Sequence, residues 1–380
     1  MSVSFGEGVY NSTIRHQVHL ERFKTATVRR LISLLNETET DIRTQVLSLD
    51  ESWTRRRLEK LLREIQTINE RAFKTLLKRT AEELGEFSVY EAEFTTAQFN
   101  KALPATLQAA IEFIAPADPL LFVAADQPQL ETLVKGRPIR DWFSDLADRD
   151  TARMHQAIRT GFLEGESTAK IVKRVIGTRP LRFKDGVREV TRRETEALVH
   201  TSVQAASTAA REQVYGANTP LIKKVRYVAT LDGRTTMICR SLDQEEFEVG
   251  EGPRPPLHMR CRSTTVPITR SWRELGFDSS DSPRGMRPFI RDKRKLKDIP
   301  KADRDALVGR VNSDLSYSKW LKRQPQDFIE SVMGKTKAKL FLDGGLPMDR
   351  FRDLGAVREY TLDELRRLEP AAFRKAGIDA

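Results

Sequence analysis

The strongest constraint on the fold is a series of apolar residues between Trp53 and Leu84. They follow one another at three- and four-residue steps, which places them on one face of a long helix. The series comprises Leu58, Leu61, Leu62, Ile65, Ile68, Phe73, Leu76 and Leu77. Ser52 predicts the N-cap of this helix, and Gly85 predicts its C-terminal end.

A second apolar face with similar spacing runs from His16 to Leu49. The two helices are expected to pack as an antiparallel hairpin or a short coiled coil. Such a pair forms either the core of a helical domain or an assembly surface. Five prolines between Phe94 and Arg140 predict short helices and turns there. A soft domain boundary is expected between Arg140 and Asp150.

A second helical block is predicted after residue 150. Its helices run from Thr151 to Glu164, from an N-cap at Ser167 to a stop at Gly177, and from Val187 to Tyr215. After Lys223 the period changes to two, which is typical of strands. The predicted strands are Val225–Thr230, Glu246–Val249 and Thr264–Ile268.

The last part of the chain divides into a basic stretch and a helical tail. Residues 271–310 are rich in Arg, Lys, Asp and Pro, which predicts an extended arm. A helix is expected from Tyr317 to Met333, with Gly334 as its stop, and a capping box opens a final helix at Thr361. The chain is therefore predicted to be α+β and mainly α, in three parts: 1–150, 151–270 and 271–380.

The charge is distributed unevenly along the 380 residues. Residues 1–150 carry 20 Lys and Arg against 23 Asp and Glu, so the net charge of +11 arises after residue 150. This asymmetry favours a polyanionic neighbour, most often nucleic acid, although solubility alone would also explain it. The candidate DNA-binding residues are Arg291, Lys293, Arg294, Lys295 and Lys297.

The longest apolar patch, residues 119–125, is far too short to span a bilayer. No N-terminal run resembles a signal peptide. With two cysteines, no disulfide framework is expected, and the chain is predicted to be a soluble protein of a reducing compartment.

Both cysteines and one of five histidines fall in one short segment, as Cys239, His258 and Cys261. Two thiolates and an imidazole are zinc ligands, and a tetrahedral site needs a fourth, for which Asp232, Asp243 or water are candidates. A structural zinc would stabilise a β unit with little apolar area. The alternative is that the cysteines are small buried hydrophobes and His258 hydrogen-bonds a carbonyl.

Three arginines flank this segment: Arg234, Arg260 and Arg262. They are expected either to bind phosphate or, more often, to pair with Asp232, Asp243 and Glu245. The chain has no Gly-rich phosphate loop, no deaminase pattern and no metalloprotease helix motif. The remaining histidines, His16, His19, His155 and His200, are interpreted as surface or helix-packing residues.

The same segment resembles the phage Mu F-like family of head-morphogenesis proteins, also called minor head or minor capsid proteins. The matching residues are the strand 225–230, Asp232-Gly-Arg234-Thr235, Cys239, and Pro255-Pro256-Leu-His258-Met-Arg-Cys261-Arg262. Within this match, the residues interpreted as the structural motif are Arg234, Thr235, Pro256 and Arg262. Similarity extends over roughly 150–365. Met259 stands where the family often has Pro, and Ser263 where a further Cys is frequent.

The resemblance implies a non-enzymatic, low-copy component of the phage head, assembled in the host bacterial cytoplasm and retained in the virion. Expected partners are the portal protein or the major coat protein, with double-stranded DNA as a further contact and self-association as an option. Deleting residues 284–310 is expected to weaken DNA retention. The rival hypothesis is a metal-dependent nuclease or toxin that uses Asp232 and His258.

Overall fold

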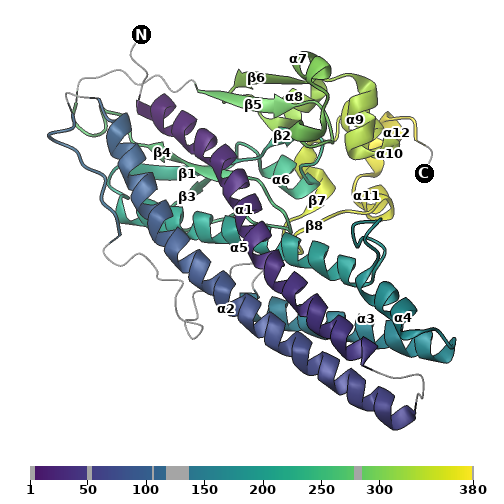
Figure 1. Ribbon diagram of the computed structural model, residues 1–380. Helices are drawn as coiled ribbons and strands as arrows, with labels where there is room; N and C mark the ends of the chain where they lie inside the picture. Colours follow the sequence, from purple (N-terminus) through teal and green to yellow (C-terminus); the bar gives the residue numbers. More distant parts are fainter. Residues whose placement is uncertain (1–4, 49–53, 105–106, 117–136, 278–284, 379–380) are drawn as a thin grey trace.

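The computed structural model describes residues 5–48, 54–104, 107–116, 137–277 and 285–378, and within them the α+β, mainly α class is confirmed (Figure 1). A bundle of long helices lies beside two small sheets and a C-terminal group of short helices. In the described ranges, the structure contains no helix with the length and apolar content that crossing a bilayer needs.

The predicted helical hairpin is confirmed, and its helices are longer than the sequence indicated. Helix α1 spans Phe5–Leu47 and helix α2 spans Arg55–Ala102, and they lie antiparallel (Figure 1). The end predicted at Gly85 is wrong, because Gly85 is buried inside α2 between the packed side chains of Leu84 and Phe87. Tertiary packing here outweighs the low helix propensity of glycine.

The start of α2 is capped by Thr54, whose side chain accepts a hydrogen bond from the backbone N–H of Arg57. The predicted cap, Ser52, lies outside the described residues. The short helices predicted after Phe94 are wrong for the first part of that stretch, because α2 continues to Ala102 before Pro104. Residues 117–136, which hold Pro119 and Pro128, also lie outside the described residues.

Three more helices complete the bundle: α3 (Ile139–Leu163), α4 (Thr168–Ile176) and α5 (Arg188–Ala217). The predicted cap at Ser167 is confirmed, and Gly177 ends α4 at a φ of 95°. Helix α3 runs through the stretch 140–150, where the boundary was expected. Helices α1, α2, α3 and α5 share one apolar core, so residues on both sides of position 150 contribute to it.

The three predicted strands form one antiparallel sheet. Strand β1 (Ile222–Val228) lies between β3 (Glu246–Glu248) and β4 (Thr264–Thr269). Tyr227 pairs with Thr265 in the register of β1 and β4. This sheet packs on the C-terminal half of α5 through Val225 and Ile222.

A second sheet occupies the region expected to be an extended arm, so that prediction is wrong. Strand β5 (Met286–Ile290) pairs in parallel with β2 (Leu231–Asp232) and antiparallel with β6 (Val308–Asn312). Two 3-10 turns, η2 (Leu296–Asp298) and η3 (Lys301–Asp303), and helix α7 (Arg304–Leu307) connect β5 to β6.

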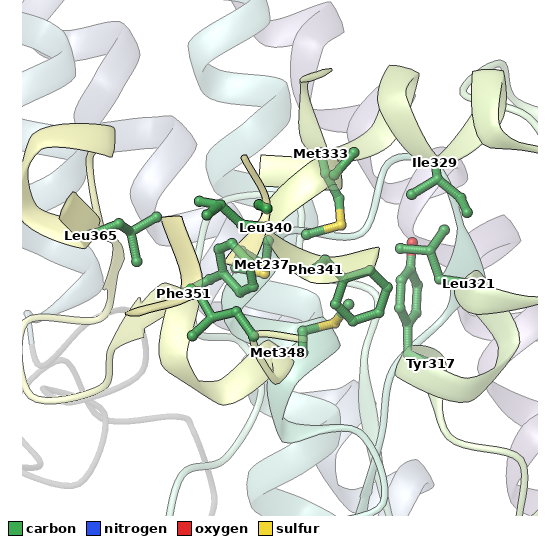
Figure 2. Packing of buried hydrophobic residues seen from close by; sticks show 14 of the residues in the cluster. Met237, Tyr317, Leu321, Ile329, Met333, Leu340, Phe341, Met348, Phe351 and Leu365 are labelled. Atoms are coloured by element: carbon green, nitrogen blue, oxygen red, sulfur yellow. The ribbon is translucent and has the colours of Figure 1, made fainter. Parts of the chain in front are cut away.

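Short helices and a hairpin form the C-terminal lobe around helix α6. These elements are α6 (Met237–Leu242), α8 (Tyr317–Lys322), α9 (Gln326–Met333), α10 (Lys335–Leu342), η4 (Met348–Phe351), β7 (Arg352–Asp353), β8 (Arg358–Glu359), α11 (Leu362–Leu368) and α12 (Pro370–Lys375). Figure 2 shows Met237 of α6 packed among Phe341, Met348 and other apolar side chains of this lobe. The lobe therefore shares its core with the segment that carries Cys239.

In this lobe the sequence predicted the helix ends better than the lengths of the helices. The single helix expected from Tyr317 to Met333 is wrong, since Pro325 separates α8 from α9. The stop at Gly334 is confirmed at a φ of 80°. The capping box at Thr361 is also confirmed, with Glu364 completing it.

Candidate functional site

The structure brings Cys239, His258 and Cys261 together. Cys239 lies on α6, and the other two residues lie in the connection between β3 and β4. The Sγ atom of Cys239 is 3.2 Å from Nε2 of His258 and 3.7 Å from Sγ of Cys261. One ligand atom from each residue lies within 4.8 Å of the other two. Three candidate metal ligands that are up to 22 residues apart in sequence thus converge on one point.

The surroundings of these groups are compatible with both interpretations made from the sequence. Both thiols are buried, and Nδ1 of His258 is 2.9 Å from the carbonyl oxygen of Met259. Assigning the Nδ1 proton to that hydrogen bond leaves the lone pair of Nε2 directed at the sulfur atoms. The same bond is what a histidine without a metal would form with a carbonyl.

Each of the two buried thiols affects the pKa of the other. The hydrogen bond between Cys239 and Cys261 raises the pKa of Cys239 well above its ordinary value, and burial adds to this effect. The same hydrogen bond, together with His258, holds the pKa of Cys261 well below its ordinary value despite burial. Burial alone lowers the pKa of His258, but the hydrogen bond and charge of Cys261 outweigh burial and raise it.

Asp232 is not brought to this group, so the structure does not support it as the fourth ligand. Its carboxylate is fully buried and accepts hydrogen bonds from Arg262 Nη2 at 2.9 Å and from Arg234 Nη2 at 3.0 Å. The backbone N–H groups of Arg234 and Thr235 donate to the same oxygen, Oδ1. Arg262 outweighs the effect of burial, and the pKa of Asp232 is lowered.

Asp243, the other carboxylate considered as a ligand, is also occupied elsewhere. It forms a two-point ion pair with Arg287 of β5, at 2.9 and 3.0 Å. It also accepts from the backbone N–H of Ala229 at 2.7 Å and of Tyr317 at 2.6 Å. Asp243 therefore joins the first sheet, the second sheet and the start of α8.

The expected structural pairing of the arginines is confirmed for Arg234 and Arg262, which bind Asp232. Arg260 instead pairs with Glu196 of α5 at 3.3 Å, a partner that the sequence did not indicate. The Thr235 hydroxyl donates to the carbonyl of Thr230 at 2.6 Å and closes the turn around Asp232. Pro256 is buried and follows a cis peptide bond.

Comparison with known proteins covers the same part of the chain. Residues 151–266 match the family model described as Phage Mu protein F like protein. This segment is phage Mu F-like. It begins within α3 and ends in β4, so it includes α4, α5, the first sheet and all three Cys and His ligand candidates. No curated protein and no solved structure matches the chain.

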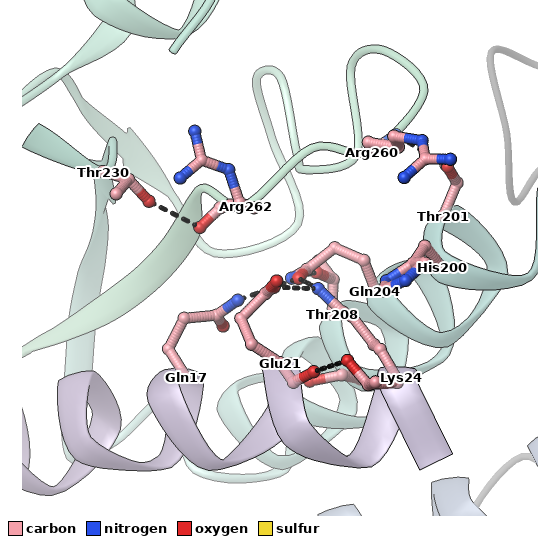
Figure 3. A network of polar contacts seen from close by, with 12 residues as sticks. Gln17, Glu21, Lys24, His200, Thr201, Gln204, Thr208, Thr230, Arg260 and Arg262 are labelled. Atoms are coloured by element: carbon pink, nitrogen blue, oxygen red, sulfur yellow. Dashed lines mark hydrogen bonds and ion pairs between the residues drawn. The ribbon is translucent and has the colours of Figure 1, made fainter. Parts of the chain in front are cut away.

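A buried polar network joins the Mu F-like segment to α1, and sequence reasoning missed it. Figure 3 shows Gln17, Glu21 and Lys24 of α1 facing Gln204 of α5. Lys24 Nζ donates to Gln204 Oε1 and to Glu21 Oε1, each at 2.6 Å, and Gln17 Nε2 donates to Gln204 at 2.9 Å. Burial lowers the pKa of Lys24. The sequence feature that could have predicted this network is the set of polar residues on the inner face of α1.

Two of the other histidines also take part in helix packing, as expected. His16 Nε2 lies 2.6 Å from the buried carboxylate of Glu91, which also accepts from Ser207 of α5 at 2.7 Å. His155 contacts the carbonyl of Leu62 at 2.9 Å. His19 is exposed.

The candidate DNA-binding residues lie in the connection between β5 and β6, beside the Asp232 turn. The backbone N–H of Gly233 donates to the carbonyl of Asp292 at 3.1 Å, and a Cβ at Gly233 would lie 2.8 Å from Lys293. Lys293, Lys295 and Lys297 are exposed. The two arginine side chains bind other groups of the protein. Arg294 pairs with Asp292, and Arg291 donates to the carbonyl of Ala306.

Proposed function

We propose that this chain is a minor head protein of a tailed phage that acts in head morphogenesis. The observation that carries the proposal is the Mu F-like segment at 151–266, because the family suggests this role. The protein would assemble in the host bacterial cytoplasm and remain in the virion. We also propose that the protein lies near the portal vertex or on the shell interior.

The helical end of the molecule is the proposed docking element for the portal or the major coat protein. Helices α1 and α2, of 43 and 48 residues, extend well beyond the sheets (Figure 1). Exposed charged pairs line α2, such as Lys60 with Glu64 and Lys78 with Glu82. A long helical bundle with a charged surface is suited to binding a partner at a distance from the basic region, and it also permits self-association.

The second sheet is the proposed DNA-facing element. Lys293, Lys295 and Lys297 are exposed on one short connection, and Arg234, whose side chain is partly exposed, lies on the adjoining turn. Exposed lysine ammonium groups bind phosphate as point charges and release counterions from DNA. This placement supports contact with the backbone of packaged DNA, without sequence specificity.

Replacing Lys293, Lys295 and Lys297 together with alanine is expected to weaken binding to duplex DNA. The slope of log K against log salt is negative, and each lost phosphate contact reduces its magnitude by about 0.9, so the magnitude should fall by up to about 3. Fluorescence anisotropy of a labelled duplex across a salt series measures this slope. Deleting residues 284–310, as the sequence suggested, is unsuitable, because it would remove β5 and Arg287.

A matched control is available on α2, where Lys60, Lys74 and Lys78 are also exposed lysines. Their replacement with alanine removes the same charge from the near-neutral end of the chain and should leave the slope within about one unit of the wild type. Equal slopes for both triple variants would contradict the assignment of DNA contact to the β5–β6 connection.

The experiment that tests the function itself is quantitative mass spectrometry of purified particles and of their empty precursors. A few to some tens of copies in both kinds of particle is the expected result. Presence in precursors alone would instead indicate a scaffold that leaves before maturation. Absence from both would contradict a head protein.

The structure offers little support for the rival nuclease or toxin. A divalent-metal nuclease needs carboxylates that can bind the ion, and those of Asp232 and Asp243 are occupied by arginines. This arrangement favours a structural role, in agreement with the family. Cleavage of DNA that requires a divalent metal and is abolished by His258→Ala would reverse this conclusion.

A further inference from the structure

We propose that Cys239, His258 and Cys261 bind one zinc ion, which fastens the β3–β4 connection to helix α6. The inference does not depend on the proposed function, because it concerns the stability of this fold. It starts from the convergence of three ligand atoms within 4.8 Å, in a part of the molecule where both sulfur atoms are buried. Each of the three residues contributes one lone pair to the same point.

The distances fit a tetrahedral ion. Zinc binds sulfur at about 2.3 Å and imidazole nitrogen at about 2.0 Å, so two sulfur ligands lie about 3.8 Å apart and sulfur and nitrogen about 3.5 Å apart. The observed separations are 3.7 Å between the sulfur atoms and 3.2 Å from Cys239 to His258. A disulfide needs about 2.0 Å between sulfur atoms, and both cysteines are free thiols.

The ring of His258 is already oriented for a metal. Its Nδ1 atom is held by the Met259 carbonyl at 2.9 Å, which leaves Nε2 as the ligand atom. Metal-binding histidines usually donate their other ring N–H to a carbonyl or carboxylate in this way. The connection that carries the ring is itself fixed to α5, because the N–H of Arg260 donates to Thr201 at 2.9 Å.

The charge around the site suits two thiolates with a divalent cation. Two thiolates and Zn²⁺ form a neutral unit, which is less costly to bury than separate charges. Thiolate and imidazole ligands in a tetrahedral arrangement favour zinc over calcium or magnesium, which take oxygen ligands.

Among the described residues, a hydroxyl group rather than a carboxylate hydrogen-bonds a ligand atom of this group. The Tyr227 hydroxyl is 3.2 Å from Cys239 Sγ. Asp232 and Asp243 are held by arginines, as described above. We therefore assign the fourth position to water or a hydroxyl. A thiol at position 263 would complete a Cys₃His set.

The test uses the full chain, isolated with reducing agent and without a metal-affinity tag, and measures bound metal by inductively coupled plasma mass spectrometry. About one zinc per chain is expected in the wild type and in the control variant His19→Gln, whose ring is exposed. His258→Gln and Cys261→Ser each remove a ligand, so they should lower zinc affinity by more than the roughly 100-fold upper range for loss of an outer-shell partner. Ser263→Cys should raise it by about 10-fold or more.

Two further measurements keep the proposal falsifiable if a cysteine variant does not fold. Chelation of the wild-type protein should lower its melting temperature, and added Zn²⁺ should restore it. Cobalt in place of zinc should give the strong visible absorption of a tetrahedral thiolate site, and His258→Gln should weaken it. Zinc-free protein with an unchanged melting temperature, or a Cys239–Cys261 disulfide under reducing conditions, would overturn the proposal.

Discussion

Replacing Arg287 with methionine is expected to destabilise the folded chain by about 3–5 kcal/mol, because the Asp243 carboxylate would remain buried without its cation. Arg287 is 2% exposed and Asp243 is 7% exposed, and two hydrogen bonds join them. Burial opposes the charge of Arg287, yet Asp243 outweighs it and raises the pKa of the guanidinium group. Urea denaturation at neutral pH, followed by circular dichroism, measures the loss.

The matched control is Arg310→Met in the neighbouring strand β6. Arg310 is exposed and sits in the same sheet, opposite Pro288, so its replacement should change stability by less than about 0.5 kcal/mol. The double variant Asp243→Leu with Arg287→Met should lose less than the two single changes together, because it leaves no buried charge. Equal losses of stability in Arg287→Met and Arg310→Met would contradict the stabilising role of the buried Arg287. They would favour a loosely packed arm at residues 285–312.

The helices were predictable where local signals agreed with packing. Ser167, Gly177, Gly334 and Thr361 mark helix ends in both the sequence and the structure, since their caps depend on neighbouring residues. Gly85 failed as a stop because contacts with distant helices, which a local pattern does not contain, keep the chain helical. The same is true of the extra length of α1 and α2.

The second sheet was not predictable from local pattern. Strand β2 has two residues, and its partner β5 begins more than fifty residues later. Charged residues in and around β5 prevented its prediction as a strand. One of them, Arg287, points inward to Asp243. A buried ion pair of this kind can be identified only when the position of Asp243 in the fold is known.

The candidate site, like the fold, was predictable only in part. Cysteine and histidine are rare in this chain, so their spacing predicted that Cys239, His258 and Cys261 would meet. The carboxylates were harder to assign, because Asp232 has the right chemistry for both a metal and an arginine. Only the positions of Arg234 and Arg262 decide between them.

Replacing Asp232 with asparagine is the second change with a large expected effect, again about 3–5 kcal/mol at neutral pH. Asparagine keeps the shape of the side chain but loses the charge that binds Arg262 and Arg234, and its NH₂ group would face a guanidinium donor. Denaturation of the variant, beside the exposed control Asp298→Asn, measures the effect. A loss no greater than that of the control would show that the Asp232 pairs contribute nothing to stability.

The pH dependence of this difference gives an independent check of the Asp232 ion pairs. The pKa of Asp232 is lowered in the folded chain from its ordinary value of 3.8, since the bonds to Arg262 outweigh burial. A carboxylate of this kind stabilises the fold fully above its unfolded-state pKa, and the stabilisation is lost as the pH falls through the folded-state pKa. The side chain of the Asp232→Asn variant does not titrate, so the gap in stability between wild type and variant should stay constant above about pH 5 and shrink below about pH 4. A gap that widens on acidification would mean that the buried carboxylate is protonated more easily in the folded state, contrary to the ion pairs with Arg262 and Arg234.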